Sequence, residues 1–315
     1  MRQEDRYIYQ VYCEGSFSKA AQKLFVTQPA LSLAIQRVEQ QIEMPLFDRS
    51  SRPLALTAAG QAYIDTIEKE MRLEQDLQRQ LKDIRDRNTG SLRLGGSHYI
   101  NAYILPEILA GFQVEYPGIQ IALQENDSAE LAHMLTEKEL DLTFSCNTSF
   151  IEAFDHFPAF YDHILLAIPE CREINTTLQD CVLTSADVVS GRHLSEDCPT
   201  VPLIHFQEES FILLKAGNNL HDRCHQMFRD AGFEPKVKMN LSQLVTACRL
   251  AEHQIGATFI SDRLVTGRET GLCYYKLNHK LADRLFYLLM PQNMYVSYAT
   301  RSFAAYVRQY MSHNY

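Results

Sequence analysis

The sequence lacks the long apolar segments that a membrane protein or a secreted precursor needs. No apolar run reaches the roughly 18–20 residues that a membrane span requires. The first six residues, Met1 to Arg6, are mostly polar or charged and do not resemble a secretory signal. We therefore expect a cytoplasmic protein with no membrane partner.

Motifs for metal binding and catalysis are also missing. The eight cysteines are scattered, and none forms a Cys-x-x-Cys pair, so a tetrahedral zinc site is not indicated. We find no His-Glu-x-x-His motif, nucleophile elbow or phosphate loop. We therefore expect that the protein is not an enzyme and has no metal site and no cofactor. Its thiols are expected to be free, as in a reducing compartment. An enzyme on an α/β fold is the weakest alternative.

What the sequence does contain is enough apolar residues for two or three folded domains, at 315 residues and 46% hydrophobic composition. The net charge of −9 is unevenly placed. Residues 1–90 carry 13 Lys or Arg and 13 Asp or Glu, so the whole acidic excess lies in residues 91–315. The segment from Ser16 to Val38 has basic residues and no acidic one. Because local charge decides what a surface attracts, this segment is compatible with nucleic-acid binding.

Two consecutive helices are predicted in this segment. Ser18 is the expected N-cap of a short helix from Lys19 to about Phe25. Thr27 and the first-turn Pro29 then open a second helix that runs to about Gln41. The buried stripe of the second helix is expected to consist of Leu31, Ile35, Val38 and Ile42.

The opposite face of the second helix carries amide, hydroxyl and guanidinium groups. Its members are Gln28, Ser32, Gln36 and Arg37. Side chains of these types read base edges in the major groove, so the pattern indicates a helix-turn-helix. The alternative is that they are solvated residues of an ordinary helix pair. A basic turn follows at residues 49–53, between two short apolar segments, and is typical of a wing that reaches a phosphate or the minor groove.

The segment from Ser16 to Gly60 resembles the N-terminal signature of LysR-type transcriptional regulators: SFSKAAQKLFVTQPALSLAIQRVEQQIEMPLFDRSSRPLALTAAG. The elements Ser-Phe-Ser-x-Ala-Ala, Gln-Pro-Ala-Leu-Ser, Pro-Leu-Phe-x-Arg and Leu-Thr-x-x-Gly stand in the family order. The resemblance implies that Gln28, Pro29, Ser32 and Arg52 contact DNA. Leu33 departs from the polar residue that is common in the family, so we expect readout to depend on Gln28, Ser32, Gln36 and Arg37.

A long amphipathic helix is predicted from Ala58 to about Arg87, with Thr57 as its cap and a hinge at residues 88–90. Its apolar seam consists of Ile64, Ile67, Met71, Leu77, Leu81 and Ile84. A single helix cannot bury such a seam alone, so a partner helix is implied. The resemblance implies antiparallel pairing into a dimer, and a tetramer built as a dimer of dimers. The alternative is that the seam packs on the C-terminal domain of the same chain.

The C-terminal part alternates predicted strands and helices, which favours a parallel α/β sheet. Strands are expected at residues 92–96, 119–125, 141–144, 211–214 and 285–290, and helices at 105–112, 129–137 and 221–231. Residues 161–169 are expected to cross between two halves of this part, and residues 257–260 to help build the second half. The resemblance implies two Rossmann-like subdomains of the type 2 periplasmic-binding-protein kind. The expected domains are a winged helix-turn-helix at 1–57, a linker helix at 58–89, and an effector domain at 90–315. Subdomain I would comprise about 90–162 and 266–315, and subdomain II about 163–265.

Ligands of open α/β sheets bind beyond the carboxyl ends of the strands. The polar residues at the expected strand ends are Ser97, His98, Asn126, Asp127, Ser128, Asn147, Thr148, Lys215, Asn218 and Asn219. Ser97 begins a helix whose free N–H groups favour an anion, and Lys215 could supply a complementary charge. The resemblance places an effector near Ser97 and Asn147. The alternatives are that Ser97 only caps its helix and that Asn218 and Asn219 only form a turn.

We therefore expect a sequence-specific DNA-binding transcriptional regulator that is controlled by a small anionic metabolite. The expected partners are double-stranded promoter DNA, further copies of the chain and the effector, with RNA polymerase as a candidate. A solute-binding protein would not explain the first ninety residues. The alternative signal is oxidation of Cys198 or Cys146, although Cys198 follows Glu196 and Asp197 rather than a basic residue that would activate it.

Overall fold

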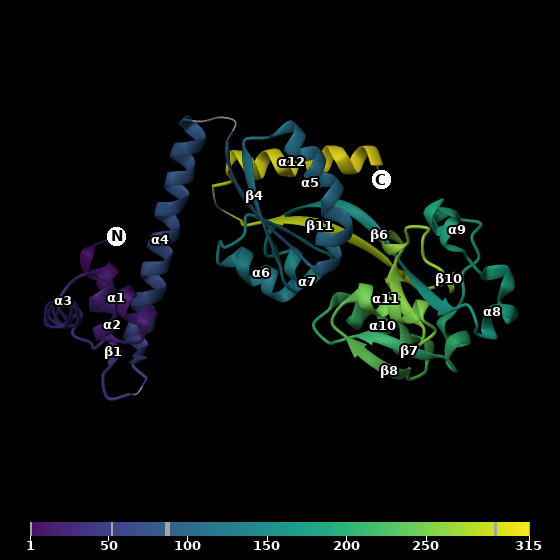
Figure 1. Ribbon diagram of the computed structural model, residues 1–315, viewed down its shortest axis with the longest axis horizontal. Coiled ribbons are helices and arrows are strands. Elements are labelled where there is room, and N and C mark those ends of the chain that lie inside the picture. Colours follow the sequence, from purple (N-terminus) through teal and green to yellow (C-terminus); the bar gives the residue numbers. More distant parts are fainter. Residues whose placement is uncertain (1, 52, 86–88, 293–294, 315) are drawn as a thin grey trace. The chain divides into compact units, whose positions relative to one another are not determined.

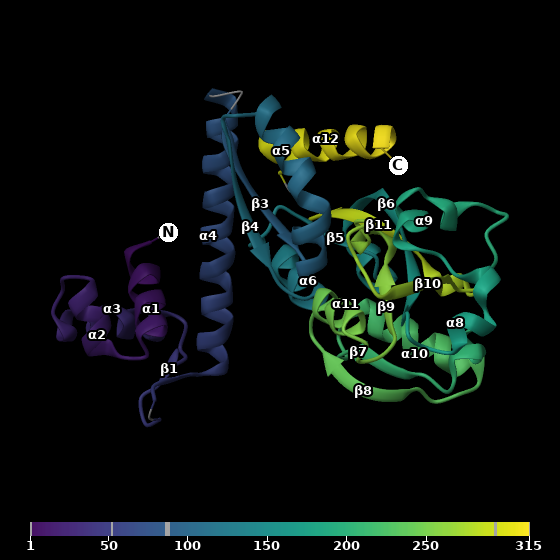
Figure 2. The same cartoon turned by 45° about the vertical axis from the view of Figure 1, so that its right-hand side comes forward.

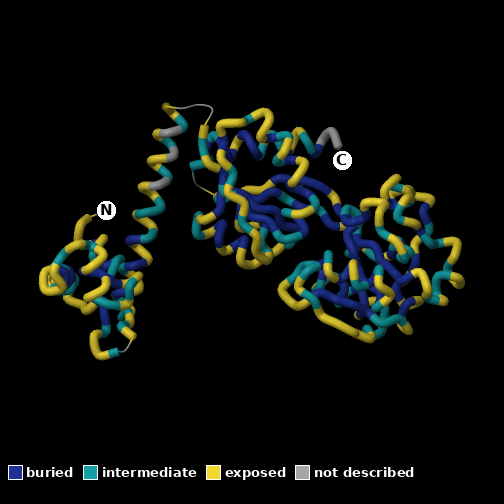
Figure 3. Tube along the Cα trace, viewed as in Figure 1, coloured by how far each residue is buried: buried dark blue, intermediate teal, exposed yellow. Residues whose placement is uncertain are grey.

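The computed structural model describes residues 2–51, 53–85, 89–292 and 295–314 (Figure 1). The chain divides into two compact units, Met1–Arg85 and Asp86–Tyr315. Each unit has its own buried core, visible in Figure 3 as separate groups of buried residues. No helix in the described ranges is both long and apolar enough to cross a membrane.

The first unit consists of helices and one small hairpin. Its elements are α1 (Gln3–Glu14), α2 (Phe17–Lys23), α3 (Gln28–Gln41), β1 (Phe47–Asp48), β2 (Ala55–Leu56) and α4 (Ala58–Arg85). The strands β1 and β2 pair antiparallel and form the base of the predicted wing. The predicted long helix is confirmed as far as Arg85, and the predicted hinge at 88–90 lies partly outside the described residues.

The predicted N-cap of α3 is confirmed, and the predicted N-cap of α2 is not. Thr27 caps α3 as predicted, with its hydroxyl accepting from the backbone N–H of Ala30 at 3.4 Å, and Pro29 lies in the first turn. The prediction that Ser18 caps α2 was wrong. Ser16 is the cap: it is extended, at φ −160° and ψ 124°, and accepts from the N–H of Lys19. Ser18 is the second residue of α2, and its hydroxyl makes a contact outside this helix.

The apolar stripe of α3 packs into the core of the first unit. Leu31, Ile35 and Val38 are buried as predicted, whereas Ile42 is only partly buried. The start of α4 closes this core with Ile64 and Ile67. Gly60 allows the close approach of α4, because a Cβ there would lie 2.0 Å from the carbonyl oxygen of Leu46.

The second unit is built on a mixed sheet in the order β10-β6-β11-β5-β3-β4, with β9 also paired to β6, and a separate β7-β8 pair. The strands are β3 (Gly90–Gly96), β4 (Ile119–Glu125), β5 (Leu142–Ser145), β6 (Asp155–Pro169), β7 (Ser210–Leu214), β8 (Lys236–Leu241), β9 (Thr258–Ser261), β10 (Leu272–Lys276) and β11 (Asp283–Met290). The expected parallel pairing holds for β3 with β4 and β5 and for β7 with β8. In contrast, β6, β9, β10 and β11 pair antiparallel, so the sheet is mixed.

Helices cover this framework in two lobes joined by β6, which runs from one lobe into the other (Figures 1 and 2). The helices are α5 (Leu105–Glu115), α6 (Ser128–Thr136), α7 (Thr148–Ile151), α8 (Ile174–Thr177), α9 (Ser185–Val189), α10 (Asn219–Ala231), α11 (Leu244–Glu252) and α12 (Tyr298–Asn314). A π-helical stretch, Ile100–Ile104, precedes α5, and short 3₁₀ turns occur at Gln179–Cys181, Arg192–Leu194, Leu203–Phe206, Asp262–Leu264 and Lys280–Ala282.

The C-terminal helix belongs to the first lobe, together with the N-terminal strands of the unit. Phe303 of α12 packs edge-on against Phe112 of α5, with ring centroids 5.1 Å apart. Tyr306 of α12 lies so close to α5 that a Cβ at Gly111 would fall 2.0 Å from the tyrosine hydroxyl. In the second lobe, α10 and α11 pack against β7. The chain therefore passes from the first lobe into the second and returns to the first.

Candidate functional site

The exposed face of α3 is one candidate site. Gln28, Pro29, Gln36 and Arg37 are exposed, and Ser32 is half-buried. Gln28 is oriented by Ser18 of α2, whose hydroxyl donates to the Gln28 side-chain oxygen at 2.8 Å. The predicted polar face is therefore present as a single surface on one helix.

Arg49 connects this face to the wing. Its guanidinium donates to Ser32 Oγ at 3.2 Å and to Glu39 Oε2 at 3.3 Å, and it lies over the Phe17 ring at 4.9 Å. Glu39 Oε1 in turn accepts from the backbone N–H of Leu46 at 2.8 Å. Arg49 directly follows β1, and these contacts hold the start of the wing against α3.

The wing turn is stabilised by Asp48. Its carboxylate accepts from the hydroxyls of Ser50 and Ser51, both at 2.6 Å, and these hydrogen bonds lower the pKa of Asp48 to about 2. The remaining predicted contact of the wing, Arg52, lies outside the described residues. The turn is thus ordered by its own serines up to the residue before Arg52.

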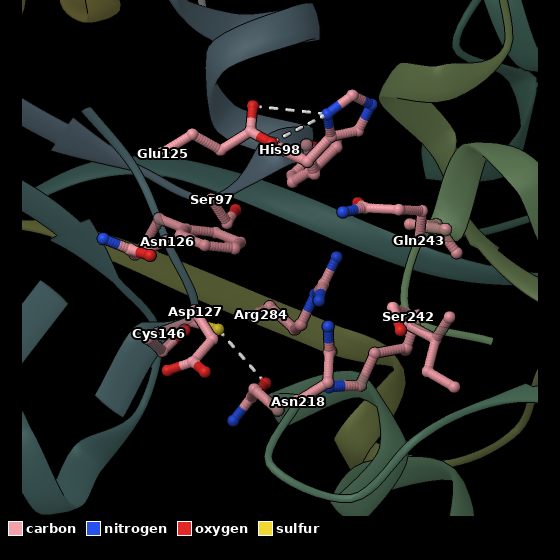
Figure 4. Close-up of a pocket in the computed structure, with 17 residues that line it drawn as sticks. Ser97, His98, Glu125, Asn126, Asp127, Cys146, Asn218, Ser242, Gln243 and Arg284 are labelled. Atoms are coloured by element: carbon pink, nitrogen blue, oxygen red, sulfur yellow. Dashed lines mark hydrogen bonds and ion pairs between the residues drawn. The ribbon is translucent and has the colours of Figure 1, made fainter. Parts of the chain in front are cut away.

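The second candidate site is a cavity of about 340 Å³ between the two lobes of the second unit (Figure 4). It is lined by Ser97, His98, Tyr99, Glu125, Asn126, Asp127, Ser128, Cys146, Leu214, Asn218, Asn219, Leu220, Ser242, Gln243, Leu244, Arg284 and Phe286. Both lobes contribute: the ends of β3, β4 and β5 on one side, and residues that follow β7 and β8 on the other. The volume is in the range of small-molecule sites.

Arg284 of β11 is the most buried charge in this lining, at 4% exposure. Its Nε donates to Asp162 Oδ1 of the neighbouring strand β6 at 2.6 Å. The hydroxyl of Tyr99 donates to the other carboxylate oxygen, also at 2.6 Å, and lies 2.9 Å from Ser261 Oγ. Burial alone would lower the pKa of Arg284, but the Asp162 carboxylate outweighs burial and raises it, so the guanidinium stays charged.

The far nitrogen of this guanidinium has unused hydrogen-bonding capacity. Arg284 Nη2 lies 2.6 Å from Asp162 Oδ1, yet the angle is not that of a hydrogen bond, and Nη2 has no other partner among the described residues. Nε already donates to that oxygen with good geometry, so Nη2 takes part in the ion pair without donating a hydrogen bond. A buried charged donor of this kind favours an acceptor from a ligand.

The structure brings together most of the predicted effector residues. Ser97, His98, Asn126, Ser128 and Asn218 line the cavity, as do Asp127 and Asn219. A helical turn begins directly after Ser97, and Ser97 Oγ accepts from the N–H of Ile100 at 3.4 Å. Asn218 also caps α10. The capping role weighed for Ser97 therefore coexists with a place in the cavity, and Asn218, for which only a turn was weighed, combines a helix cap with such a place.

Three predicted residues are not among those that line the cavity. Asn147 accepts from the N–H of Ser149 at 3.1 Å and caps α7, and Thr148 is the first residue of that helix. Lys215 is exposed, so the positive charge that we expected from it is supplied instead by Arg284.

Sequence reasoning missed the residues that line the cavity from inside strands or from unpredicted segments, namely Arg284, Tyr99, Cys146, Glu125 and Gln243. One signal was present: Arg284 directly precedes an apolar run, and Asp162 lies one residue before another. Their pairing is visible only in the register of β6 and β11, where Arg284 lies opposite Asp162.

The two cysteines considered as redox sensors are both buried. Cys146 lines the cavity and donates to Asn219 Oδ1 at 3.1 Å, and burial raises the pKa of its thiol. A raised pKa keeps the sulfur in its less reactive protonated form. Among the described residues there is no group of three or more His, Cys, Asp or Glu side chains that could hold a metal ion.

Comparison with known proteins gives matches over both units. Residues 4–61 match the family described as "Bacterial regulatory helix-turn-helix protein, lysR family", and residues 85–178 and 187–312 match the "LysR substrate binding domain". A "Probable RuBisCO transcriptional regulator" of Cyanidioschyzon merolae is 35% identical over 267 residues, which are 81% of this chain and 80% of the relative.

Solved structures agree on the fold. Full-length CbnR complexed with its target DNA aligns with a TM-score of 0.65 at 17% identity, covering 98% of this chain and 99% of that one. The effector binding domain of QuiR, solved in complex with shikimate, aligns with a TM-score of 0.59 at 14% identity, covering 72% of this chain and 99% of that one.

Proposed function

Because the chain belongs to the LysR family of DNA-binding transcriptional regulators, we propose that a small anionic effector bound at Arg284 controls how α3 and the wing engage promoter DNA. The chain is a regulator with an effector-binding domain and is not an enzyme. The observation that carries the effector proposal is Arg284, a buried charged side chain that lines the cavity and whose Nη2 has no hydrogen-bond acceptor among the described residues.

The anionic group would contact Arg284 and the helical turn after Ser97. A carboxylate placed there can accept charge-assisted hydrogen bonds from the guanidinium and bonds from the free N–H groups of the turn. The remaining lining amides of Asn126, Asn218 and Gln243 offer both donors and acceptors for the rest of the molecule. The solved complex of the QuiR effector domain with shikimate supports a small-molecule ligand for this fold.

DNA would be read by Gln28, Pro29, Ser32, Gln36 and Arg37. Their position on one exposed face of α3, with Gln28 and Ser32 held by Ser18 and Arg49, supports readout in the major groove. The solved complex of CbnR with its target DNA supports DNA binding by this fold. Arg52 is proposed on the sequence alone, as a phosphate contact that does not depend on base sequence.

Assembly would use the second half of α4. Leu73, Leu77, Leu81 and Ile84 are 62%, 51%, 50% and 76% exposed within a single chain. An exposed apolar seam on a helix is stabilised by a partner helix, so we propose antiparallel pairing with a second copy. We extend this proposal to a dimer of dimers, which would contact separated half-sites. Contact with RNA polymerase remains a prediction.

The DNA-reading proposal is tested by gel shift with a target site selected from random duplexes. Arg37→Ala and Gln36→Ala should each weaken binding by about 1–3 kcal/mol, the value of a good base-edge contact. Gln61→Ala, which removes an exposed amide on α4, is the matched control and should leave affinity unchanged. Unchanged affinity in both α3 variants would refute the assignment of α3 as the recognition helix.

A further inference from the structure

Acidic side chains outnumber lysine and arginine among the described residues that line the cavity. Arg284 is the only lysine or arginine among the lining residues that the structure describes, and Glu125 and Asp127 are both acidic. The charge of Arg284 is already matched by Asp162, which lies behind it in β6. The lining therefore presents one oriented guanidinium and two carboxylates, of which Glu125 is paired with the titratable His98 ring.

The two carboxylates differ in how far the protein itself satisfies them. Asp127 Oδ1 accepts from the N–H groups of Ala129 and Glu130, at 3.0 and 2.9 Å, to cap α6. No bond to Asp127 Oδ2 is found from the described residues. Both oxygens of Glu125 lie 3.3 Å from Nδ1 of the His98 ring, and this contact is an ion pair when the imidazole is protonated. Negative charge thus remains available on the β4 and α6 side of the cavity.

Figure 4 shows how these groups are arranged. Glu125 and Asp127 come from the β4–α6 segment, the Arg284 guanidinium extends from β11 into the cavity, and Gln243 comes from the opposite lobe. A simple carboxylate would satisfy Arg284 but would add a third negative charge to a partly enclosed space, where like charges repel strongly. A ligand that carries a cation beside its carboxylate avoids this repulsion.

We infer that the effector is zwitterionic, with a carboxylate at Arg284 and an ammonium group at Asp127, on the side of the cavity that also carries Glu125, as in an α-amino acid or a close derivative. This inference rests on the proposed function and adds a positive charge to the proposed anionic effector. The Arg284 guanidinium orients the carboxylate, and the acidic side of the cavity selects the cation. Discrimination then arises because an uncharged substituent would leave the Asp127 carboxylate unpaired.

The chain offers a substitution that isolates the charge of Asp127. Asparagine caps helices about as well as aspartate, so Asp127→Asn keeps an acceptor for the N–H groups of Ala129 and Glu130. It removes only the negative charge. An equal melting temperature of the two unliganded proteins would confirm that the cap is retained.

The test is a thermal-shift measurement on the full-length protein with each common α-amino acid, and with the carboxylic acid of the same skeleton that lacks the amino group, at about 10 mM. Matched pairs include alanine with propionate, glutamate with glutarate and phenylalanine with 3-phenylpropionate. We expect at least one amino acid to raise the melting temperature. The matching acid without the amino group should bind with an affinity roughly tenfold lower. Asp127→Asn should reduce this preference roughly tenfold.

The outcomes separate this inference from the proposed function. If deaminated acids bind as well as or better than amino acids, or if Asp127→Asn leaves the preference unchanged, the effector is an ordinary anion and the inference fails while the proposed function stands. If no compound of either class stabilises the protein, both fail.

Discussion

The two candidate sites differ in how far apart along the chain their residues lie. The DNA-reading face lies within Gln28–Arg37, on a single helix, and its side chains are exposed or half-buried. The cavity draws on residues from Ser97 to Phe286 and depends on a buried charge in β11. A site on one helix can therefore change its specificity with little effect on folding, whereas a site that shares residues with the core cannot.

Removing the carboxylate behind Arg284 is the strongest way to test this difference. Asp162→Asn leaves a buried guanidinium without its counter-charge, and breaking a buried pair in this way costs about 3–5 kcal/mol. We expect the free energy of unfolding of the second unit, measured with denaturant, to fall by that amount. Asp155→Asn, at an exposed position of the same strand, is the control. A loss below about 1 kcal/mol would mean that the site and the core are separable.

A charge in the α4 seam should affect assembly rather than folding. Leu77→Glu places a carboxylate at a position that is half-exposed in the single chain but would be buried against a partner helix. Sedimentation should show that the dissociation constant of the dimer rises by roughly two orders of magnitude or more, because two such charges would be buried per dimer. Glu70→Gln, exposed on the same helix, should assemble normally. A dimer that tolerates Leu77→Glu would exclude this seam as the interface.

The cap of α2 offers a smaller, local test in the first unit. Ser16→Ala should destabilise that unit by about 1 kcal/mol, because the N–H of Lys19 loses its acceptor. Ser18→Ala removes only an exposed bond to Gln28, so its thermal stability should stay nearly unchanged. The reverse order of melting temperatures would restore Ser18 as the cap.

The smallest expected effect is a gain of stability at Phe25. This residue joins α2 to α3 with φ at +55° and is 96% exposed, so its ring contributes little packing. Glycine adopts positive φ without the Cβ penalty, and Phe25→Gly should raise stability by roughly 0.5–1 kcal/mol. Phe25→Ala keeps the Cβ and is the control, with no such gain. A lower melting temperature for the glycine variant would show that the ring packs after all.

The difference between a site on one helix and a site assembled from distant strands also explains which features could be predicted from the sequence. The α3 face, the Thr27 cap and the long α4 follow from side chains a few positions apart, which periodicity and capping rules describe. Ser97, Asn126 and Asn218 could be predicted because strand ends converge at one edge of a sheet. Arg284 could not, because its partner Asp162 is 122 positions away and is brought to it by strand register. Asn147 and Lys215 met the same strand-end criterion, but one caps α7 and the other is exposed.

The most direct test of the account compares Arg37→Ala and Ser97→Ala in the same set of measurements. Each protein is assayed for affinity to the selected DNA site without ligand, and for affinity to the amino acid that most stabilises the wild type. We predict that Arg37→Ala weakens only DNA binding and that Ser97→Ala weakens only ligand binding, by roughly tenfold or more through the lost hydrogen bond. If either variant loses both activities together, or if Ser97→Ala loses neither, the proposed division between DNA reading and effector binding is contradicted.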